Sequence, residues 1–358
     1  MQPDFVQPDG SPIPAELVSA TLRSAVGPEV EPPSFTLENH GQFSNDLAVA
    51  TLADGRRMIV KRGRYAWSAE RFDTARRAAG LFGAAGITTP RSVDLPAELS
   101  RAAVDAYWRI ELPTLAELWP ELGPGERRSA MRSLGRLMRK AHTARLPGHG
   151  ELRAMAGHPR LLSQVLAEDL GGRLMPAVGA EWPDGVPLVD CLLGMIPEVA
   201  RRAGEAGVLL HGDLHMGNVV CERAGGAVAC TGLLDLECAH AGPAESDLAR
   251  LAVMHTDLFG MPAGGPWLEW VREGYGEAVD PVVYGFYVVY QLAQLGFHSA
   301  WLGHHEHAAS VAAAARPAAA ALPALPQASQ HVASRSPEAR GGVLSAPHPP
   351  AEGELVPG

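Results

Sequence analysis

Residues 208–235 read VLLHGDLHMGNVVCERAGGAVACTGLLD, and the rest of the chain is interpreted outward from this stretch. Its first three residues form an apolar run that is typical of a short buried strand. Such a strand would deliver the polar loop that starts at His211 and contains Asp213 to its carboxyl end. This loop is therefore the first candidate for a functional site.

A β-hairpin is predicted directly after this loop. Asn218 opens a second apolar run, a Gly225-Gly226 turn follows, and the return strand ends at Asp235. A short hairpin with Asn218 and Asp235 at its outer ends places two oxygen ligands side by side, and Mg²⁺ takes such ligands while substrate phosphates complete its shell. Asp213, on the separate loop, could accept a proton from an attacking hydroxyl without binding the metal. Phosphoryl transfer requires this combination of metal-held phosphates and a positioned base.

Two motifs in this region resemble those of a known family. The H-G-D-x-x-x-x-N spacing of residues 211–218 resembles the catalytic loop of aminoglycoside phosphotransferases and related small-molecule kinases of the protein-kinase-like superfamily. The LLDLE sequence at 233–237 resembles their metal-binding segment, and Gly242-Pro243 and Asp247-Leu248-Ala249 fit the continuation of the family pattern. The resemblance covers roughly residues 35–300, with strong motifs only around the catalytic loop.

The resemblance implies a role for each matching residue. Asp213 would be the catalytic base, and Asn218 and Asp235 would be the Mg²⁺ ligands. His211 would brace the catalytic loop, and Asp247 would be structural.

Each of these residues also has a simpler interpretation. A lone HGD tripeptide occurs by chance, and an aspartate at a strand end is often a cap or turn residue. The loop, the spacing, the hairpin and the second aspartate agree here, which favours the kinase-type interpretation. His211 alone is more typical of a structural residue than of a catalyst. Glu237, two residues after Asp235, is either a group that supports the metal or a solvated charge.

Strands joined by tight turns are predicted upstream, over residues 35–61. Asp54-Gly55 is a hairpin signal, and the last of these strands ends at Lys61. Lys61 and Lys140 are the only lysines of the chain, and a lysine inside an apolar strand indicates selection for a compact charge. Kinase-type folds place the lysine that binds the α- and β-phosphates at this position. The alternative is a strand-end lysine whose stem is buried while its charge reaches water.

The turn between the first two strands is a weaker candidate for phosphate binding. It contains Ser44 and Asn45, and its backbone N–H groups could fold over the phosphates of a nucleotide. Only Gly41 is present and no G-x-G-x-x-G sequence occurs. A plain β-turn formed by Ser44 and Asn45 is therefore the alternative.

A helix predicted over residues 68–85 would carry the carboxylate that pairs with Lys61. Glu70 and Asp73 lie near its start, and Glu70 is preferred for its reach. The resembling family usually has this glutamate somewhat later, where this chain has Ala75. The alternative is therefore that the ion pair is rearranged or absent.

Residues 104–112 are predicted to form the last strand of the first lobe. Glu111 and Leu112 then begin the predicted hinge between the lobes, where nucleotide kinases hold adenine through backbone groups. Pro113 lacks an N–H donor, so any donor would come from a neighbour.

The second lobe is predicted to be mostly helical. Residues 145–207 form an insertion before the catalytic loop, and in the resembling family such insertions help to form the acceptor site. One helix is expected to start at a Ser246 N-cap. The expected helices are 125–144, 158–170, 188–203, 246–258, 267–279 and 281–301.

Together these patterns and the resemblance predict an α+β, two-lobed, protein-kinase-like fold. It would combine a small β-meander N-lobe that binds nucleotide with a larger, mostly helical C-lobe that carries catalysis and substrate binding. The expected boundaries are 1–33 for an N-terminal extension with a helix near 14–26, 34–112 for the N-lobe, 113–322 for the C-lobe, and 323–358 for a disordered tail rich in Pro, Ala, Ser and Gly.

The composition is that of a globular protein, with 46% hydrophobic and 20% charged residues among 358. A net charge of -10 argues against a nucleic-acid partner and is compatible with a cationic substrate. The four cysteines form no C-x-x-C pair, which suits a reducing compartment. We find no charged leader and no apolar run of the ~18 residues of a membrane span, so we expect a cytoplasmic protein without a membrane partner.

The function predicted from these features is transfer of a phosphate from ATP (or GTP), with Mg²⁺, to a hydroxyl of a small molecule. By analogy with the resembling family, the acceptor would be an antibiotic or related natural product, modified in resistance or biosynthesis. A metabolic kinase acting on an amino alcohol or sugar and a catalytically silent nucleotide-binding module are the alternatives. A protein kinase is disfavoured, because Asp235 and Gly242 lie only seven positions apart and leave little platform for a peptide.

Overall fold

The structure is a computed structural model that describes residues 13–27, 35–41, 45–65, 67–153 and 159–322. Ser44 and the tail predicted at 323–358 lie outside these ranges. The described part is α+β, with an antiparallel sheet in the N-lobe and helices in the C-lobe, as the sequence predicted.

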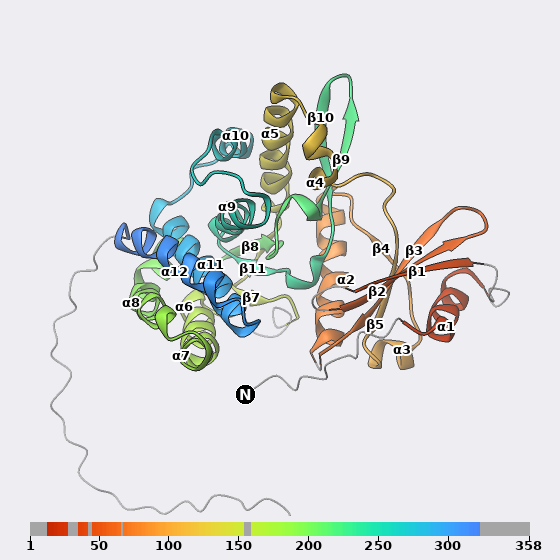
Figure 1. The fold of residues 1–358 in the computed structure, drawn as a ribbon, viewed down its shortest axis with the longest axis horizontal. Coiled ribbons are helices and arrows are strands. Elements are labelled where there is room, and N and C mark those ends of the chain that lie inside the picture. Colours follow the sequence, from red (N-terminus) through yellow and green to blue (C-terminus); the bar gives the residue numbers. More distant parts are fainter. Residues whose placement is uncertain (1–12, 28–34, 42–44, 66, 154–158, 323–358) are drawn as a thin grey trace, which may run out of the picture. The chain divides into compact units, whose positions relative to one another are not determined.

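The N-lobe is built on one antiparallel β-sheet in the order β1-β2-β3-β5-β4 (Figure 1). The predicted Asp54-Gly55 turn joins β2 to β3, and the φ of 84° at Gly55 is one that glycine adopts without strain. The strands are β1 Phe35–Gly41, β2 Asn45–Leu52, β3 Arg57–Gly63, β4 Arg91–Ser92 and β5 Val104–Trp108.

Alternation along the strands gives this sheet two different faces. On one face Met58 and Val60 belong to the same buried cluster as Val18 and Leu22 of α1 (Ala15–Val26), the helix predicted near 14–26. The other face carries Lys61 and lies toward α2 (Ser68–Ala84), which lines a cavity together with that lysine. A short helix, α3 (Ala97–Arg101), precedes β5.

The strand and hairpin predicted around residues 211–218, called the catalytic loop here after the motif that they resemble, are confirmed. The buried strand β8 is Gly207–Leu210, and the hairpin pairs β9 (Val219–Ala224) with β10 (Ala227–Leu233). β8 also belongs to a sheet in the order β6-β8-β11-β7 that the sequence did not reveal. Its other strands are too short to show a period, since β6 (Arg145–Leu146) and β7 (Gly150–Glu151) have two residues and β11 (His240–Gly242) has three.

The C-lobe is mostly helical, as predicted. α9 begins one residue before the predicted Ser246 cap, and its N-cap position is Ala244, which makes no side-chain cap, so that detail was wrong. The sequence analysis did not predict α12, because its many alanines mark no apolar stripe. The helices are α4 Leu115–Leu118, α5 Pro124–Ala141, α6 Leu162–Leu166, a π-helix Ala167–Leu174, α7 Met175–Glu181, α8 Val186–Ala203, α9 Glu245–Phe259, α10 Pro266–Tyr275, α11 Pro281–Trp301 and α12 His305–Ala320.

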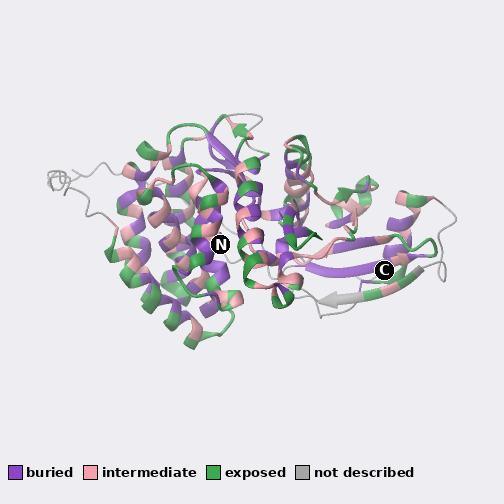
Figure 2. Ribbon diagram, turned by 90° about the horizontal axis from the view of Figure 1, so that it is seen from above, coloured by how far each residue is buried: buried purple, intermediate pink, exposed green. Residues whose placement is uncertain are grey.

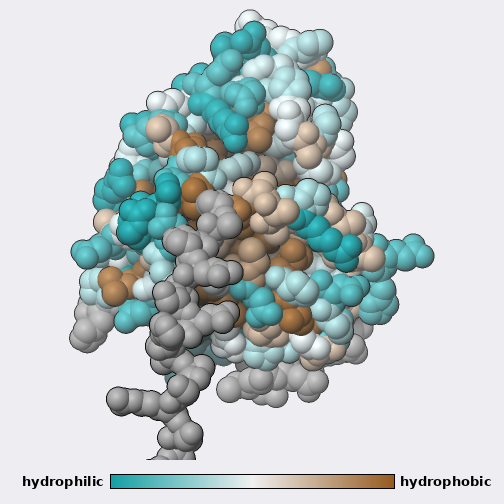
Figure 3. Space-filling view, turned by 90° about the vertical axis from the view of Figure 1, so that its left-hand side faces the viewer, coloured by the Kyte–Doolittle hydropathy of each residue, from teal (hydrophilic) through white to brown (hydrophobic). Residues whose placement is uncertain are grey.

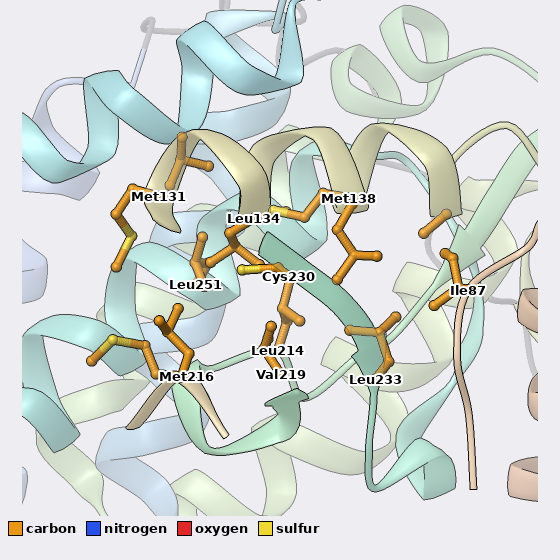
Figure 4. Close-up of a cluster of buried hydrophobic side chains, with 14 of the residues drawn as sticks. Ile87, Met131, Leu134, Met138, Leu214, Met216, Val219, Cys230, Leu233 and Leu251 are labelled. Atoms are coloured by element: carbon orange, nitrogen blue, oxygen red, sulfur yellow. The ribbon is translucent and has the colours of Figure 1, made fainter. Parts of the chain in front are cut away.

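One buried core holds the hairpin and the catalytic loop against α5 (Figure 4). Met131, Leu134 and Met138 of α5 meet residues of β9 and β10 in this core. Leu214 and Met216, from the catalytic loop itself, are 1% and 0% exposed there. Burying a side chain of this size contributes about 1.5–3 kcal/mol, so these two residues anchor the loop from within.

Most helices bury one side and expose the other (Figure 2). On the face shown in Figure 3, hydrophilic residues surround scattered apolar ones. Among the described residues, no helix has the length and apolar character needed to cross a membrane.

Candidate active site

His211 connects the catalytic loop to the hairpin. Its Nδ1 accepts the backbone N–H of Asp213 at 3.2 Å, and its Nε2 lies 2.8 Å from the carbonyl oxygen of Leu234. Because Nδ1 accepts, the proton of a neutral ring must lie on Nε2 and be donated to Leu234. This arrangement agrees with the bracing role inferred from the sequence.

Asp247 holds the backbone of the same loop. Its carboxylate accepts the N–H groups of His211 at 2.8 Å and Gly212 at 2.9 Å, and Nε2 of His142 lies 3.3 Å away. Burial alone would raise the pKa of Asp247, but the hydrogen bond and charge of His142 and the contacts with His211 lower it to about 2. A permanently charged carboxylate therefore fixes the start of the loop.

Gly212 is required by the close approach of two segments. Its φ is 79°, and a Cβ at this position would lie 2.1 Å from the carbonyl oxygen of Cys238. No other residue fits such a contact without moving the backbone. The HGD motif therefore has a glycine because the loop passes directly over the segment that follows Asp235.

Asn218 and Asp235, the predicted metal ligands, are brought together by the hairpin. The N–H of Leu234 donates to the carbonyl oxygen of Asn218 at 2.9 Å, so the residue preceding Asp235 is bonded to Asn218. The side-chain amide of Asn218 donates to the carbonyl oxygen of Asp213 at 2.9 Å, which leaves its Oδ1 available to a cation. Asp235 has left-handed backbone angles (φ 54°, ψ 65°), which aspartate tolerates better than most residues.

These oxygens suit Mg²⁺, which needs few protein ligands when phosphates supply the others. Within the described ranges, no group of three or more His, Cys, Asp or Glu residues could hold a metal ion. A site made of one carboxylate and one amide oxygen would therefore depend on a nucleotide for the remaining ligands.

Lys61 is buried between two carboxylates. Its Nζ lies 2.9 Å from Oδ1 of Asp235 and 2.6 Å from Oε1 of Glu237, and the residue is 4% exposed. Burial opposes the charge on Lys61, but the nearby acidic groups outweigh it and keep the pKa well above its usual value. The lysine is thus charged and points at the predicted metal ligand.

Glu237 is a buried partner of Lys61 and not a solvated charge. It is 9% exposed, and the side-chain amide of Asn45 donates to both of its oxygens, at 3.2 and 3.0 Å. Burial raises the pKa of Glu237, while Lys61 opposes that shift. Asn45, predicted as a nucleotide-binding residue, therefore uses its side chain to orient the carboxylate that faces Lys61.

The predicted pairing of Glu70 with Lys61 is wrong. Glu70 lies on the outer side of α2, where Arg153 is 2.8 Å away. Ala75, where the resembling family was expected to have its glutamate, lines a small cavity of about 30 Å³ with Lys61 and Glu237. Because alanine has no carboxylate to offer from α2, the partner of Lys61 comes from the segment after Asp235.

Glu111 and Leu112, the predicted hinge residues, lie between two points held by backbone hydrogen bonds. The N–H of Arg109 donates to Arg57, and the carbonyl oxygen of Pro113 accepts from Cys221, both at 2.9 Å. Neither N–H of Glu111 or Leu112 has a hydrogen-bond partner among the residues that the structure describes, so both stay available. The side chain of Glu111 is exposed and pairs with Arg57.

Sequence reasoning missed an apolar surface beside Lys61. Leu47, Val49 and Ile59 form a small cluster with Tyr107 on the face of the sheet that carries the lysine. The alternation of β2 and β3 could have revealed it, because Leu47, Ile59 and Lys61 share the face set by the strand period. An apolar surface next to the lysine that is predicted to bind phosphates suits a nucleotide base.

Asp213 itself is paired with a residue that sequence reasoning also missed. Its Oδ1 lies 2.6 Å from Nη2 and 3.2 Å from Nε of Arg250, which is on α9. The structure therefore brings Asp213, Asn218, Asp235, Lys61 and Glu237 around one hairpin end, with His211 behind them.

Comparison with known proteins gives the family and the fold. The model of a family described as "Phosphotransferase enzyme family" matches residues 36–287, and no curated protein matches. A thermostable mutant of aminoglycoside phosphotransferase APH(4)-Ia, in the apo form, has a TM-score of 0.62 at 15% identity. The match covers 86% of this chain and 98% of that protein's chain. A macrolide 2'-phosphotransferase type I has a TM-score of 0.55 at 17% identity, with coverages of 85% and 98%.

Spectinomycin phosphotransferase APH(9)-Ia, in complex with ADP and spectinomycin, has a TM-score of 0.54 at 16% identity and covers 86% of this chain and 99% of its own. At these identities the likeness shows the fold alone. The protein-kinase-like fold predicted from the sequence is confirmed.

Proposed function

Because the chain belongs to the phosphotransferase enzyme family, we propose that it transfers the γ-phosphate of ATP to a hydroxyl group of a small molecule, with Mg²⁺ as its cofactor. Asp213 orients the acceptor hydroxyl and takes its proton as the new O–P bond forms and the bond to the ADP oxygen breaks. Lys61 holds the α- and β-phosphates of the donor.

Asn218 and Asp235 would hold the metal ion through Oδ1 of the amide and through the carboxylate. When bound, Mg²⁺ neutralises the negative charge that develops on the phosphates. The amide contact from Asn218 to Asp213 and the Lys61–Asp235 ion pair support this assignment, because they orient both side chains before any ligand arrives.

The nucleotide base would lie on the apolar surface of Leu47, Val49, Ile59 and Tyr107. The free backbone N–H groups of Glu111 and Leu112 would donate hydrogen bonds to the polar edge of the base, as expected for the predicted hinge. Structures of APH(4)-Ia with similar folds contain ADP or AMP-PNP, which supports a nucleotide as the donor.

We place the acceptor among antibiotics and related natural products. Proteins of similar fold are described in complex with hygromycin B or with spectinomycin, and a third is a macrolide phosphotransferase. The helices α6 to α8, which precede the catalytic loop, would contribute to the acceptor site.

The observation that carries this proposal is the convergence of Asp213, Asn218, Asp235 and Lys61 at one hairpin end. A binding module that never transfers phosphate has no need of all four. The test is a panel in which the full chain, Mg²⁺ and ATP are incubated with aminoglycosides, macrolides, spectinomycin, peptide and nucleoside antibiotics, choline and sugars.

Mass spectrometry would look for the gain of one phosphate, with the Asp213→Ala variant as control. A phosphorylated antibiotic that is absent from the control supports the proposal. Phosphorylated choline or sugar would replace the antibiotic with a metabolic acceptor. Equal products from both proteins would contradict the base role of Asp213.

A further inference from the structure

We propose that Arg250 is a positioning residue that orients the carboxylate of Asp213 for proton transfer, an inference that rests on the proposed function. Arg250 donates to one oxygen only, because Nη2 and Nε both approach Oδ1, at 2.6 and 3.2 Å. Among the described residues, Oδ2 has no hydrogen-bond partner. The oxygen left free is the one that faces the acceptor hydroxyl.

Arg250 gains its position from α9. This helix also carries Asp247, which accepts the backbone N–H groups at the start of the catalytic loop. Asp247 and Arg250 are three residues apart, a spacing that places both side chains on the same side of a helix. One helix therefore holds the backbone of the loop with an anion and the side chain of Asp213 with a cation.

Arg250 is itself held in place. Its Nη1 donates to Oε1 of Gln291 at 3.1 Å, and Gln291 of α11 is 5% exposed. The three side chains form a line of hydrogen bonds from the interior of the C-lobe to the predicted base. A guanidinium fixed at both ends can hold a carboxylate at one angle, which a mobile surface cation cannot do.

The surroundings of Asp213 contain other charged and titratable groups. His215 lies on the same loop, Asp235 follows the hairpin, and Cys238 lies in the segment after it. Arg250 is the group that makes a direct ion pair with the Asp213 side chain in the described ranges. Arg250 is therefore the residue that can orient the carboxylate of Asp213.

The simpler interpretation is an ion pair that only stabilises the fold. The two side chains are 18% and 26% exposed, and an ion pair that is open to solvent often contributes little to stability. A misplaced catalytic group, in contrast, can cost about 10²-fold in rate. If Arg250 positions Asp213, replacing Arg250 should slow phosphate transfer only when Asp213 is present. If Arg250 only stabilises the fold, the effect on the rate should be the same with and without Asp213.

A double-mutant cycle separates them. The full chain, Arg250→Gln, Asp213→Ala and the double variant would be assayed for phosphate transfer to the acceptor found by the panel. Slow hydrolysis of MgATP provides a second reaction, in which water accepts the phosphate and no small-molecule acceptor is needed. Arg250→Lys tests whether the forked guanidinium matters. Arg101→Gln on α3, where the side chain is 76% exposed, is the matched control.

We expect Arg250→Gln to lower kcat by about 10²-fold with an unchanged KM for ATP, and Arg250→Lys to recover part of the loss. In the Asp213→Ala background the same change should have less than about a threefold effect, because no carboxylate remains to be oriented. Arg101→Gln should leave both reactions unchanged.

Equal losses in the two backgrounds, or no loss from Arg250→Gln, would overturn the positioning role. The proposed function stays intact in that case, provided that Asp213→Ala strongly lowers the rate and leaves a residual rate that can still be measured. If Asp213→Ala were as active as the unaltered chain in both reactions, the base role of Asp213 would fail and the inference would fail with it. These results are distinguishable from the kinetic data alone.

Discussion

The ammonium group of Lys61 lies 2.6 Å from the carboxylate of Glu237, although the two residues are 176 positions apart. The N-lobe strand that carries the lysine is thereby bonded to the segment that follows the predicted metal ligand Asp235. Ala75 offers no carboxylate from α2, and Glu70 points away to Arg153. The charge of Lys61 is therefore neutralised beside the predicted metal site, without a carboxylate from α2.

The first prediction compares Glu237→Gln with Glu70→Gln. Loss of the Glu237 charge leaves Lys61 with Asp235 alone, so the lysine competes with the metal for that carboxylate. We expect the KM for MgATP to rise by about tenfold, because groups that support metal ligands typically contribute this much. Glu70→Gln is the matched control, since its exposed ion pair contributes little, and its KM should change by less than about twofold.

Steady-state kinetics at varied MgATP concentration would measure the KM of both variants. The reverse order, with Glu70→Gln the more harmful change, would mean that α2 supplies the working partner of Lys61 once nucleotide is bound.

The second prediction concerns Asp235→Asn. An amide cannot provide the charge that draws Mg²⁺ to this position, so the metal should no longer strengthen nucleotide binding. Calorimetric titration with ADP, in Mg²⁺ and in EDTA, should show a clear difference for the unaltered chain and almost none for the variant. The control is Asp184→Asn, at an exposed position before α8. Its affinity for ADP should differ between Mg²⁺ and EDTA as much as that of the unaltered chain. A full Mg²⁺ effect in Asp235→Asn would remove this residue from the metal site.

The strand, loop and hairpin of the site could be predicted because the residues that form them follow one another in the sequence. The strand, loop and hairpin between residues 207 and 235 follow from apolar runs, glycines and spacing, and they appear in the structure where the sequence places them. The same holds for the β2–β3 turn at Gly55 and for α11, whose predicted bounds are those observed.

The contacts between distant segments could not be predicted. Glu70 is on α2 and Glu237 lies 176 positions from Lys61, so only the packing of the folded chain decides which of them reaches the lysine. Arg250 bears no mark in the sequence beyond its spacing from Asp247. α12 consists largely of alanine, and the short strands of the second sheet pair only because β8 lies between them.

The third prediction compares two glycines. Gly212→Ala would place a Cβ 2.1 Å from the carbonyl oxygen of Cys238 at a φ of 79°, so the loop must shift. We expect the free energy of unfolding to fall by more than about 2 kcal/mol and phosphate transfer to be lost, because Asp213 is the next residue. Gly194→Ala, in the interior of α8 with nothing within 4 Å of the new Cβ, should instead stabilise the protein by roughly 0.5–1 kcal/mol.

Urea unfolding of both variants, followed by circular dichroism, would measure these changes. A Gly212→Ala protein with unchanged stability and activity would show that the loop and the Cys238 segment are not in close contact.

The fourth prediction follows from His255, a buried histidine of α9. Both of its ring nitrogens lack a hydrogen-bond partner among the described residues, and its ring packs against Phe259 and Trp267. Burial lowers the pKa of His255 from 6.5 to about 3. The folded protein therefore keeps this ring neutral at pH values where the unfolded chain protonates it.

The sign of the pH effect follows from proton binding. Between pH 6.5 and pH 3 the unfolded chain binds one more proton at His255 than the folded protein does, so stability falls as the pH is lowered through this range. Between pH 8 and pH 5, His255 should lower the free energy of unfolding by roughly 2 kcal/mol. The His255→Leu variant lacks this group, so its free energy of unfolding should fall by that much less over the same interval. At pH 8 the variant should be no less stable than the unaltered chain.

Urea unfolding at pH 8, 6.5 and 5 would measure the difference, with His304→Leu at an exposed position as the control. Parallel losses in His255→Leu and the unaltered chain would mean that the folded protein can protonate His255, and that its ring has access to water or a partner.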